Sequence, residues 1–245
     1  MNFNITYGDG EFLSGVMGYD SVTVGGITVP KQEIAAVNFA AWDGDGVTSG
    51  LMGLAYPAIT SAYEGTDPED DSESVEYNPI FITMYKENLT APYFSLAIER
   101  ADSGPAGYLA LGGLPPVNYT EPFASTPIQY LTASNGGDSF TESNYTYYVI
   151  SPQGIIYPGT NGTVNATGFQ AIVDSGTTLN YFPTAIADEI NAAFVPPATW
   201  SDYEGGYVVD CNATAPSVAV EIDGVLFYTN PDDLILDDGT GTDTW

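Results

Sequence analysis

The sequence predicts an all-β fold with a few short helices. Runs of alternating apolar and polar residues recur along the chain, as in "SVTVGGITV" (21–29) and "SVAVEIDGVLFYT" (217–229). Tyrosine, threonine and valine, which favour strands, are abundant, and glycine, proline, asparagine and aspartate divide the runs into short pieces. Because 44% of the 245 residues are hydrophobic, the chain can bury a core, and wholesale disorder is excluded.

The first half of the chain is expected to consist of strands and one helix. Strand-like segments fill most of residues 1–60, and "PIFITMYKENL" (79–89) has the apolar spacing of a short helix. Between them, "EGTDPEDDSESVEY" (64–77) holds seven carboxylates and no cation. We interpret it as a solvated loop rather than a metal site, because it lacks the ligand and glycine order of a calcium loop. Strands resume in "YFSLAIER" (93–100) and "GYLALGGL" (107–114).

The second half is expected to contain further strands and a second helix. Pro115 and Pro116 mark a boundary that divides the chain into domains 1–115 and 116–245. The apolar run 171–173 has the character of a buried strand. "PTAIADEINAAF" (183–194) predicts a helix, with Pro183 near its start and three apolar residues on one face: Ile186, Ile190 and Phe194.

The charge balance is extreme, with three cations, 32 carboxylates and no histidine, and a formal net charge of −29. Such a chain repels phosphate backbones and anionic lipid, so nucleic-acid and membrane-surface roles are excluded as main functions. In acid the carboxylates protonate and only Lys31, Lys86 and Arg100 stay charged, so self-repulsion is small. Acid tolerance is one interpretation of this composition, and solubility alone is the other.

Seven N-glycosylation sequons suggest passage through a secretory pathway, and therefore an extracellular, secretory or vacuolar location: Asn4, Asn88, Asn118, Asn144, Asn161, Asn165 and Asn212. A chain rich in asparagine and threonine also produces some by chance. No apolar run is long enough to span a bilayer, and the N-terminus has no signal-peptide pattern. Cys211 is the only cysteine, so it is either a lone thiol or half of a bridge whose partner is absent.

One short stretch, "QAIVDSGTTLNYFP" (170–183), suggests chemistry. An apolar run delivers Asp174 onto a tight turn, where Gly176 permits close backbone approach. Hydroxyls at Ser175, Thr177 and Thr178 are able to hydrogen-bond the carboxylate and orient it. An ordinary turn is the alternative, because Asp, Ser and Gly are common turn residues.

"AIVDSGTT" (171–178) resembles the second catalytic motif of the pepsin-like aspartic proteases, especially their secreted fungal branch. Three further segments match that family in order: "YGDGEFLSGVMGYDSVTVGG" (7–26) is similar to its flap hairpin, "SGLMGLAYP" (49–57) to the segment that closes the first lobe's active-site loop, and "GYLALGGL" (107–114) to the strand that leaves that lobe. The resemblance implies a bilobal, all-β fold.

The resemblance also implies roles for named residues. Asp174 would be one of two catalytic aspartates, supported by Ser175 and Thr178, with Gly176 and Thr177 beside the substrate. From the flap, residues Tyr7, Gly8 and Asp9 would cover the substrate. Leu51 and Tyr147 would line the pockets beside the scissile bond, or else belong to the core.

In that family the first catalytic motif precedes the flap, and here the flap begins at residue 7. We therefore expect the chain to hold the second half of the N-terminal lobe and the first half of the C-terminal lobe, without the first aspartate. The resemblance also places the disulfide partner of Cys211 beyond residue 245.

The function implied is aspartic-type endopeptidase activity on polypeptide substrates at acid pH, without a cofactor or metal, by a full-length protein that is a monomer. One alternative is a non-catalytic peptide-binding relative. Another is a homodimer in which two Asp174 residues face each other.

Overall fold

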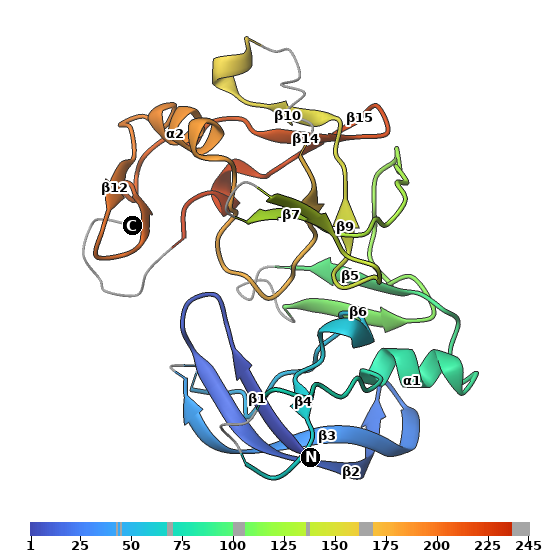
Figure 1. Cartoon of the computed structure of the whole chain (residues 1–245). Helices are drawn as coiled ribbons and strands as arrows, with labels where there is room; N and C mark the ends of the chain where they lie inside the picture. Colours follow the sequence, from blue (N-terminus) through green and yellow to red (C-terminus); the bar gives the residue numbers. More distant parts are fainter. Residues whose placement is uncertain are drawn as a thin grey trace. The chain divides into compact units, whose positions relative to one another are not determined.

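The computed structural model describes residues 1–42, 44, 46–67, 71–99, 106–135, 138–161 and 169–236 (Figure 1). The chain divides into two units, each of which is described by itself. The first comprises Met1–Thr120 and Glu142–Tyr147, and the second comprises Glu121–Thr141 and Tyr148–Trp245. The described residues are mostly strands with two α-helices, which confirms the predicted all-β class.

The first unit is built on a four-stranded antiparallel sheet in the order β3-β2-β1-β4. Its strands are β1 (Asn2–Thr6), β2 (Phe12–Val24), β3 (Ile27–Ala41) and β4 (Ala62–Tyr63). The β2–β3 turn falls on Gly25 and Gly26, with φ values of 57° and 81° that glycine adopts without strain. Strands β1, β2 and β3 together fill most of residues 1–60, as predicted, although none is found among the described residues between Ala41 and Ala62. The glycines and aspartates of 43–50 favour turns over a ladder.

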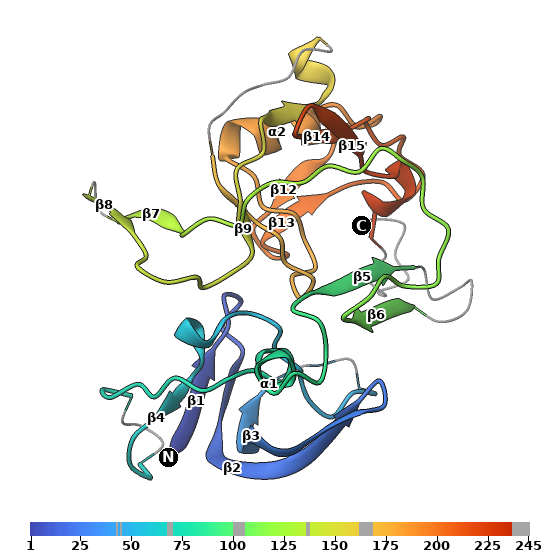
Figure 2. The ribbon, with the colours of Figure 1, turned by 90° about the vertical axis from the view of Figure 1, so that its right-hand side faces the viewer.

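A helix and a second hairpin complete this unit. Helix α1 (Ile80–Lys86) lies within the predicted segment 79–89, and strands β5 (Phe94–Ile98) and β6 (Gly107–Leu111) pair antiparallel. Figure 2 looks along the axis of α1, with β3 beside it. The helix packs on β3 through a buried cluster of Val29, Ile80 and Met84, with four half-buried neighbours: Val22, Val24, Ile27 and Leu111. A single-turn 3₁₀ helix, η1, spans Pro57–Ile59.

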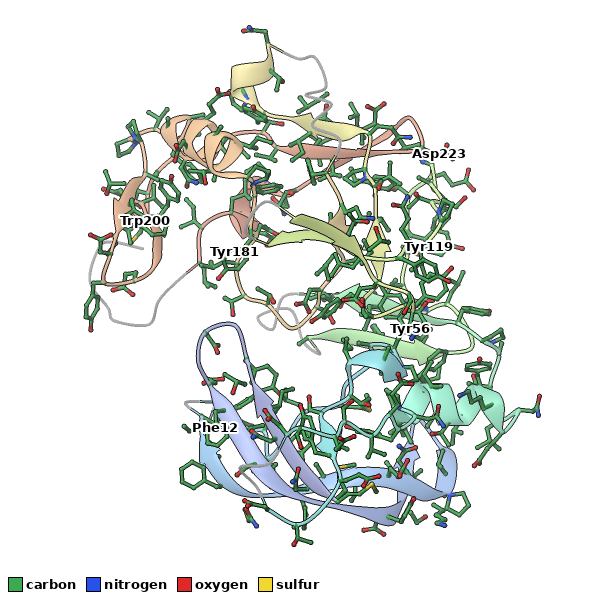
Figure 3. All side chains as sticks on the ribbon, in the orientation of Figure 1. Phe12, Tyr56, Tyr119, Tyr181, Trp200 and Asp223 are labelled. Atoms are coloured by element: carbon green, nitrogen blue, oxygen red, sulfur yellow. The ribbon has the colours of Figure 1, made fainter. Side chains whose placement is uncertain are left out.

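The second unit has a three-stranded sheet, β10-β14-β15, formed by Gly154–Ile156, Ala219–Ile222 and Val225–Tyr228. The β14–β15 hairpin turns at Asp223 and Gly224, both with positive φ, as an Asp-Gly turn requires. Asp223 is labelled at this tip in Figure 3. Three two-stranded ladders accompany the sheet: β7 (Thr132–Asn135) with β8 (Asp138–Thr141), β9 (Val149–Ile150) with β11 (Ala171–Ile172), and β12 (Thr199–Ser201) with β13 (Gly206–Val208).

Helix α2 (Thr184–Ala192) covers the core of this unit and lies within the predicted segment 183–194. Its apolar face buries Ile186 and Ile190 against Ile155, Tyr157 and Val218. Phe194, just after the helix, is also buried, as the apolar spacing predicted. Two 3₁₀ turns, η3 (Pro158–Thr160) and η4 (Pro231–Asp233), complete the second unit.

Candidate active site

Asp174 lies on an exposed loop directly after β11, and its carboxylate is held by two donors. The Gly176 amide donates to Oδ1 at 2.8 Å, and the Thr177 hydroxyl donates to Oδ2 at 2.6 Å. The first bond closes an Asx turn, and the second occupies the other oxygen. With one donor on each oxygen, the plane of the carboxylate is fixed while its outer edge faces solvent.

The strand that carries Asp174 is not buried, contrary to the expectation from its apolar sequence. Ile172 is 43% exposed and Val173 is 60% exposed. β11 has only two residues and pairs with β9 alone among the described strands. The Val173 amide continues the ladder by donating to the Tyr148 carbonyl at 3.0 Å.

The second donor distinguishes Asp174 from ordinary turn residues of this chain. Asp9, Asp210 and Asn230 each accept one amide hydrogen bond from the residue two positions on, at 2.8–3.1 Å. The Asx turn is therefore common here and does not by itself indicate catalysis. The hydroxyl bond from Thr177 is the feature added at Asp174.

Of the three hydroxyls expected to be able to orient the Asp174 carboxylate, one bonds it in the described part of the chain. Thr177, rather than Ser175 or Thr178, supplies the hydroxyl that bonds the carboxylate in the described part of the chain. Among the described residues no backbone approaches Gly176 closely, since a Cβ added there would meet only the Asp174 Oδ1, at 3.4 Å. Gly176 therefore contributes its amide rather than space.

The letters Asp-Ser-Gly occur a second time, at 102–104, outside the described residues. That triplet follows Glu99, Arg100 and Ala101 rather than an apolar run, and no threonine follows it. It lacks the context that singled out Asp174.

The segment expected to be a flap is the turn between β1 and β2. The Tyr7 amide donates to the Glu11 carbonyl at 2.8 Å, and the Gly10 amide donates to the Tyr7 carbonyl at 3.0 Å. Gly10 has a φ of 93°, which favours glycine. The first arm of this hairpin is β1, so the hairpin also includes residues before Tyr7, the residue at which the segment matched to the flap begins.

Trp42 contacts Tyr7, and the sequence analysis did not identify Trp42 as a candidate site residue. The rings of Tyr7 and Trp42 meet edge to face, with centroids 5.8 Å apart. The β2–β3 register pairs Phe12 with Ala41 and so brings Trp42 beside the base of the turn. An open concavity at this point is lined by Asp9, Gly10, Glu11, Ala41 and Trp42. Only the strand register, which is not apparent from local sequence, could have identified Trp42.

Burial raises the pKa of Tyr7 above its usual value, and the carboxylates of Glu11 and Asp9 raise it further. The Tyr7 hydroxyl is therefore protonated through the acid and neutral range. It is a hydrogen-bond donor at any pH at which an acid enzyme would work.

The two expected pocket residues are exposed, and both lie in the first unit. Leu51 is 62% exposed and Tyr147 is 38% exposed. Tyr147 ends the segment 142–147, which joins the first unit where the Tyr56 amide donates to the Thr146 carbonyl at 3.1 Å. Asp174 through Thr178 lie in the second unit, so the structure describes the two groups of residues separately.

Three further features of the described residues bear on the sequence predictions. These residues contain no group of three or more His, Cys, Asp or Glu side chains able to hold a metal. None of the described helices has the length and apolar character needed to cross a membrane. Cys211 is half-buried in the turn that follows Asp210.

The family model of the eukaryotic aspartyl proteases matches residues 1–244 of the chain. The chain belongs to the eukaryotic aspartyl protease family. This confirms the resemblance seen in the sequence motifs.

Several curated relatives of this aspartyl protease chain are fungal proteins. It is 49% identical to a probable aspartic-type endopeptidase of Aspergillus fumigatus, over 96% of this chain and 52% of that protein. It is 32% identical to mucorpepsin of Rhizomucor pusillus, over 86% and 46% respectively. To penicillopepsin-3 of Penicillium janthinellum it is 30% identical, over 91% and 49%. The aspartyl protease chain therefore spans about half the length of the curated relatives it matches.

Proposed function

We propose that this protein is an aspartic endopeptidase that hydrolyses polypeptides at acid pH, with Asp174 as one of its two catalytic carboxylates. The observation that carries the proposal is the Asp174 carboxylate, fixed through both oxygens at the exposed end of β11 in a chain of the aspartyl protease family. The second carboxylate is proposed to lie in a part of the protein outside these 245 residues.

The chemistry requires two carboxylates close together, because such a pair shares one proton, as is known of the aspartic proteases as a class. The ionised member acts as a base on a bound water. The protonated member polarises the carbonyl of the scissile peptide. In this scheme the Gly176 amide and the Thr177 hydroxyl orient Asp174 toward its partner and toward the water.

Substrate contacts are proposed for residues of both units. Tyr7, Gly8 and Asp9 would cover the peptide from the β1–β2 turn, exclude water and donate hydrogen bonds to its backbone. Leu51 and Tyr147 would line pockets for the side chains beside the scissile bond, and their exposure leaves them accessible for this. In the second unit, backbone groups of Gly176 and Thr177 are proposed to contact substrate.

Acid operation is supported by the partners of the two described lysines. The Lys31 Nζ lies 4.4 Å from the ring centroid of Tyr19, and the Lys86 Nζ donates to the Asn78 Oδ1 at 2.7 Å. Both partners are neutral, so protonation of the carboxylates removes neither contact. We propose that the protein acts outside the cell or in an acidic compartment of the secretory pathway, as a monomer, with Cys211 bridged to a cysteine outside the present chain.

The deciding experiment is Asp174→Asn in the intact protein, assayed with a fluorogenic peptide at acid pH. The amide cannot share the proton, so hydrolysis should fall roughly 10⁴-fold while the melting temperature is unchanged. Asp210→Asn is the matched control, because Asp210 makes the same Asx turn without the hydroxyl bond. Undiminished hydrolysis by the Asp174 variant would remove this residue from the mechanism.

Two further outcomes separate the alternatives. An intact wild-type protein that binds a transition-state inhibitor but cleaves no peptide would be a non-catalytic peptide-binding relative. Turnover by the 245-residue chain alone would indicate a dimer if it rose as the square of concentration. If that turnover were linear, the second carboxylate would lie within the chain, and Asp102 would be the first residue to replace.

A further inference from the structure

We propose that the protein carries N-linked glycans at its exposed sequons, and that the sequon of Asn144 is retained for glycosylation at a cost to the fold. The inference rests on the secretory passage proposed above, but not on catalysis. Three independent observations support it: the number of sequons, the exposure of their asparagines and the burial of one hydroxyl.

The number of sequons exceeds what composition produces. Seven of the 14 asparagines are followed two positions later by threonine, and none of the seven sequons uses serine. With 25 threonines in 245 residues, random order would place a threonine there for only about one or two asparagines. The chance interpretation of the sequons therefore does not account for them.

Most of the asparagines are also at positions that can carry a bulky polar group. Among the described residues, five are exposed: Asn88, Asn118, Asn144, Asn161 and Asn212. Asn88 follows helix α1 with a φ of 58°, and Asn212 lies on the turn after Cys211. Asn4 is the contrast, because it is half-buried in the middle of β1 and paired with Ser14. Asn165 lies outside the described residues.

The sequon of Asn144 contains a hydroxyl that the fold does not use. Thr146 is 5% exposed, and its Oγ1 has no hydrogen-bond partner among the described residues. Its neighbours explain the burial. The Thr146 carbonyl accepts from the Tyr56 amide, and the ring centroids of Tyr145 and Tyr56 lie 5.4 Å apart with 32° between the ring planes. Tyr56 is labelled in Figure 3.

A buried hydroxyl without a partner loses its hydrogen bonds to water and gains none in return, so it destabilises the folded state. Valine has nearly the same shape and would avoid that loss. The sequon, however, requires threonine or serine at this position. The hydroxyl of Thr146 is therefore explained by modification of Asn144, whose side chain is exposed two residues earlier.

The glycans would cover apolar surface. The middle residues of three exposed sequons are themselves exposed and apolar or aromatic: Leu89 is 41%, Tyr119 is 55% and Tyr145 is 42% exposed. A glycan on the preceding asparagine would shield each side chain from association with other molecules.

The test is to secrete the 245-residue chain from a eukaryotic host behind a general leader and to map modified asparagines by peptide mass spectrometry, with and without glycosidase. Asn144 should be modified in the wild type and in Thr146→Ser, which keeps the sequon. It should be unmodified in Thr146→Val and Asn144→Gln. Asn88, Asn118 and Asn212 should be modified in all four proteins. Asn4 should have the lowest fraction of modified side chains among these asparagines.

Stability gives a second readout. After glycosidase treatment of all samples, Thr146→Val should melt at the same temperature as the wild type or higher, because it buries no unpaired hydroxyl. A lower melting temperature would show that the hydroxyl serves the fold, and an unmodified Asn144 in the wild type would overturn the proposal directly.

If the chain is not secreted, cell-free translation with microsomes and the same peptide mapping decides the question. An unmodified Asn144 there is equally a refutation. Because no peptidase activity is measured, failure of this inference is distinguishable from failure of the proposed catalytic function.

Discussion

Replacing Gly10 by alanine tests the positive φ at the tip of the proposed flap, which glycine adopts without strain and alanine does not. Gly10 has a φ of 93°, whereas Gly8, two residues earlier in the same turn, is outside the positive-φ region. A Cβ added at either position meets no atom within 4 Å, so the two substitutions differ in backbone conformation and not in packing.

The expected magnitude follows from that comparison. Both alanines restrict the unfolded chain equally, which favours folding by about 0.4–1 kcal/mol. Only Gly10→Ala carries the cost of a left-handed backbone, about 1–2 kcal/mol. The free energies of unfolding of the two variants should therefore differ by about 1–2 kcal/mol, and their melting temperatures by roughly 2–8 °C for a chain of this size.

Thermal or urea unfolding of Gly8→Ala, Gly10→Ala and the wild type measures this difference. Limited proteolysis of the turn checks whether strain is relieved by local opening instead of global destabilisation. Equal unfolding midpoints together with equal cleavage rates in the turn would refute the claim that alanine at position 10 is strained by a positive φ.

Two more predictions concern single contacts in each unit. Met84 is fully buried, so Met84→Ala should lower the free energy of unfolding, measured by urea titration, by about 2–5 kcal/mol. Tyr85 lies on the exposed side of α1, so Tyr85→Ala should lower it by about 1 kcal/mol or less in the same titration. Equal losses for the two variants would contradict the packing of α1 on β3. The hydrogen bond that Tyr207 donates to Asp188 raises the pKa of Tyr207 above its usual value, so Asp188→Asn should lower that pKa in a tyrosinate absorbance titration. Because the pKa of Tyr207 is raised in the folded state, this hydrogen bond contributes to folding stability at every pH below the pKa of an unfolded tyrosine. That contribution is lost only as the pH rises through the higher pKa of the folded state. An unchanged titration curve for the variant would contradict the assignment of the raised pKa to this bond.

Much of the fold could be predicted because it depends on local chemistry. Turn pairs such as Gly25–Gly26 and Asp223–Gly224 adopt positive φ and so determine where two hairpins reverse. The apolar spacing of 183–194 predicted helix α2 and its buried face. These preferences involve only a few adjacent residues, so they do not depend on how the rest of the chain folds.

The candidate site was predicted less completely, for a physical reason. The local sequence pattern correctly predicted that Asp174 is a carboxylate on a turn, but it did not show that Thr177 would be the hydroxyl donor. A side-chain hydrogen bond depends on rotamer and turn geometry, and three neighbouring hydroxyls are chemically equivalent in the sequence. The apolar run before Asp174 predicted a buried strand, and the structure shows an exposed one. Burial depends on what covers a strand and not on the strand's own sequence alone.

The sequence by itself determined the all-β class, the positions of the hairpin turns, the charge of −29, the sequons and the family motif around Asp174. The tertiary structure decided which distant residues meet. Trp42 reaches Tyr7 only through the register of the long β2–β3 hairpin, and the Thr146 hydroxyl is buried because the segment 142–147 joins the first unit at Tyr56. Turns and periodicity arise from the dihedral preferences of a few adjacent residues, whereas such contacts depend on strand register and long-range packing summed over many residues.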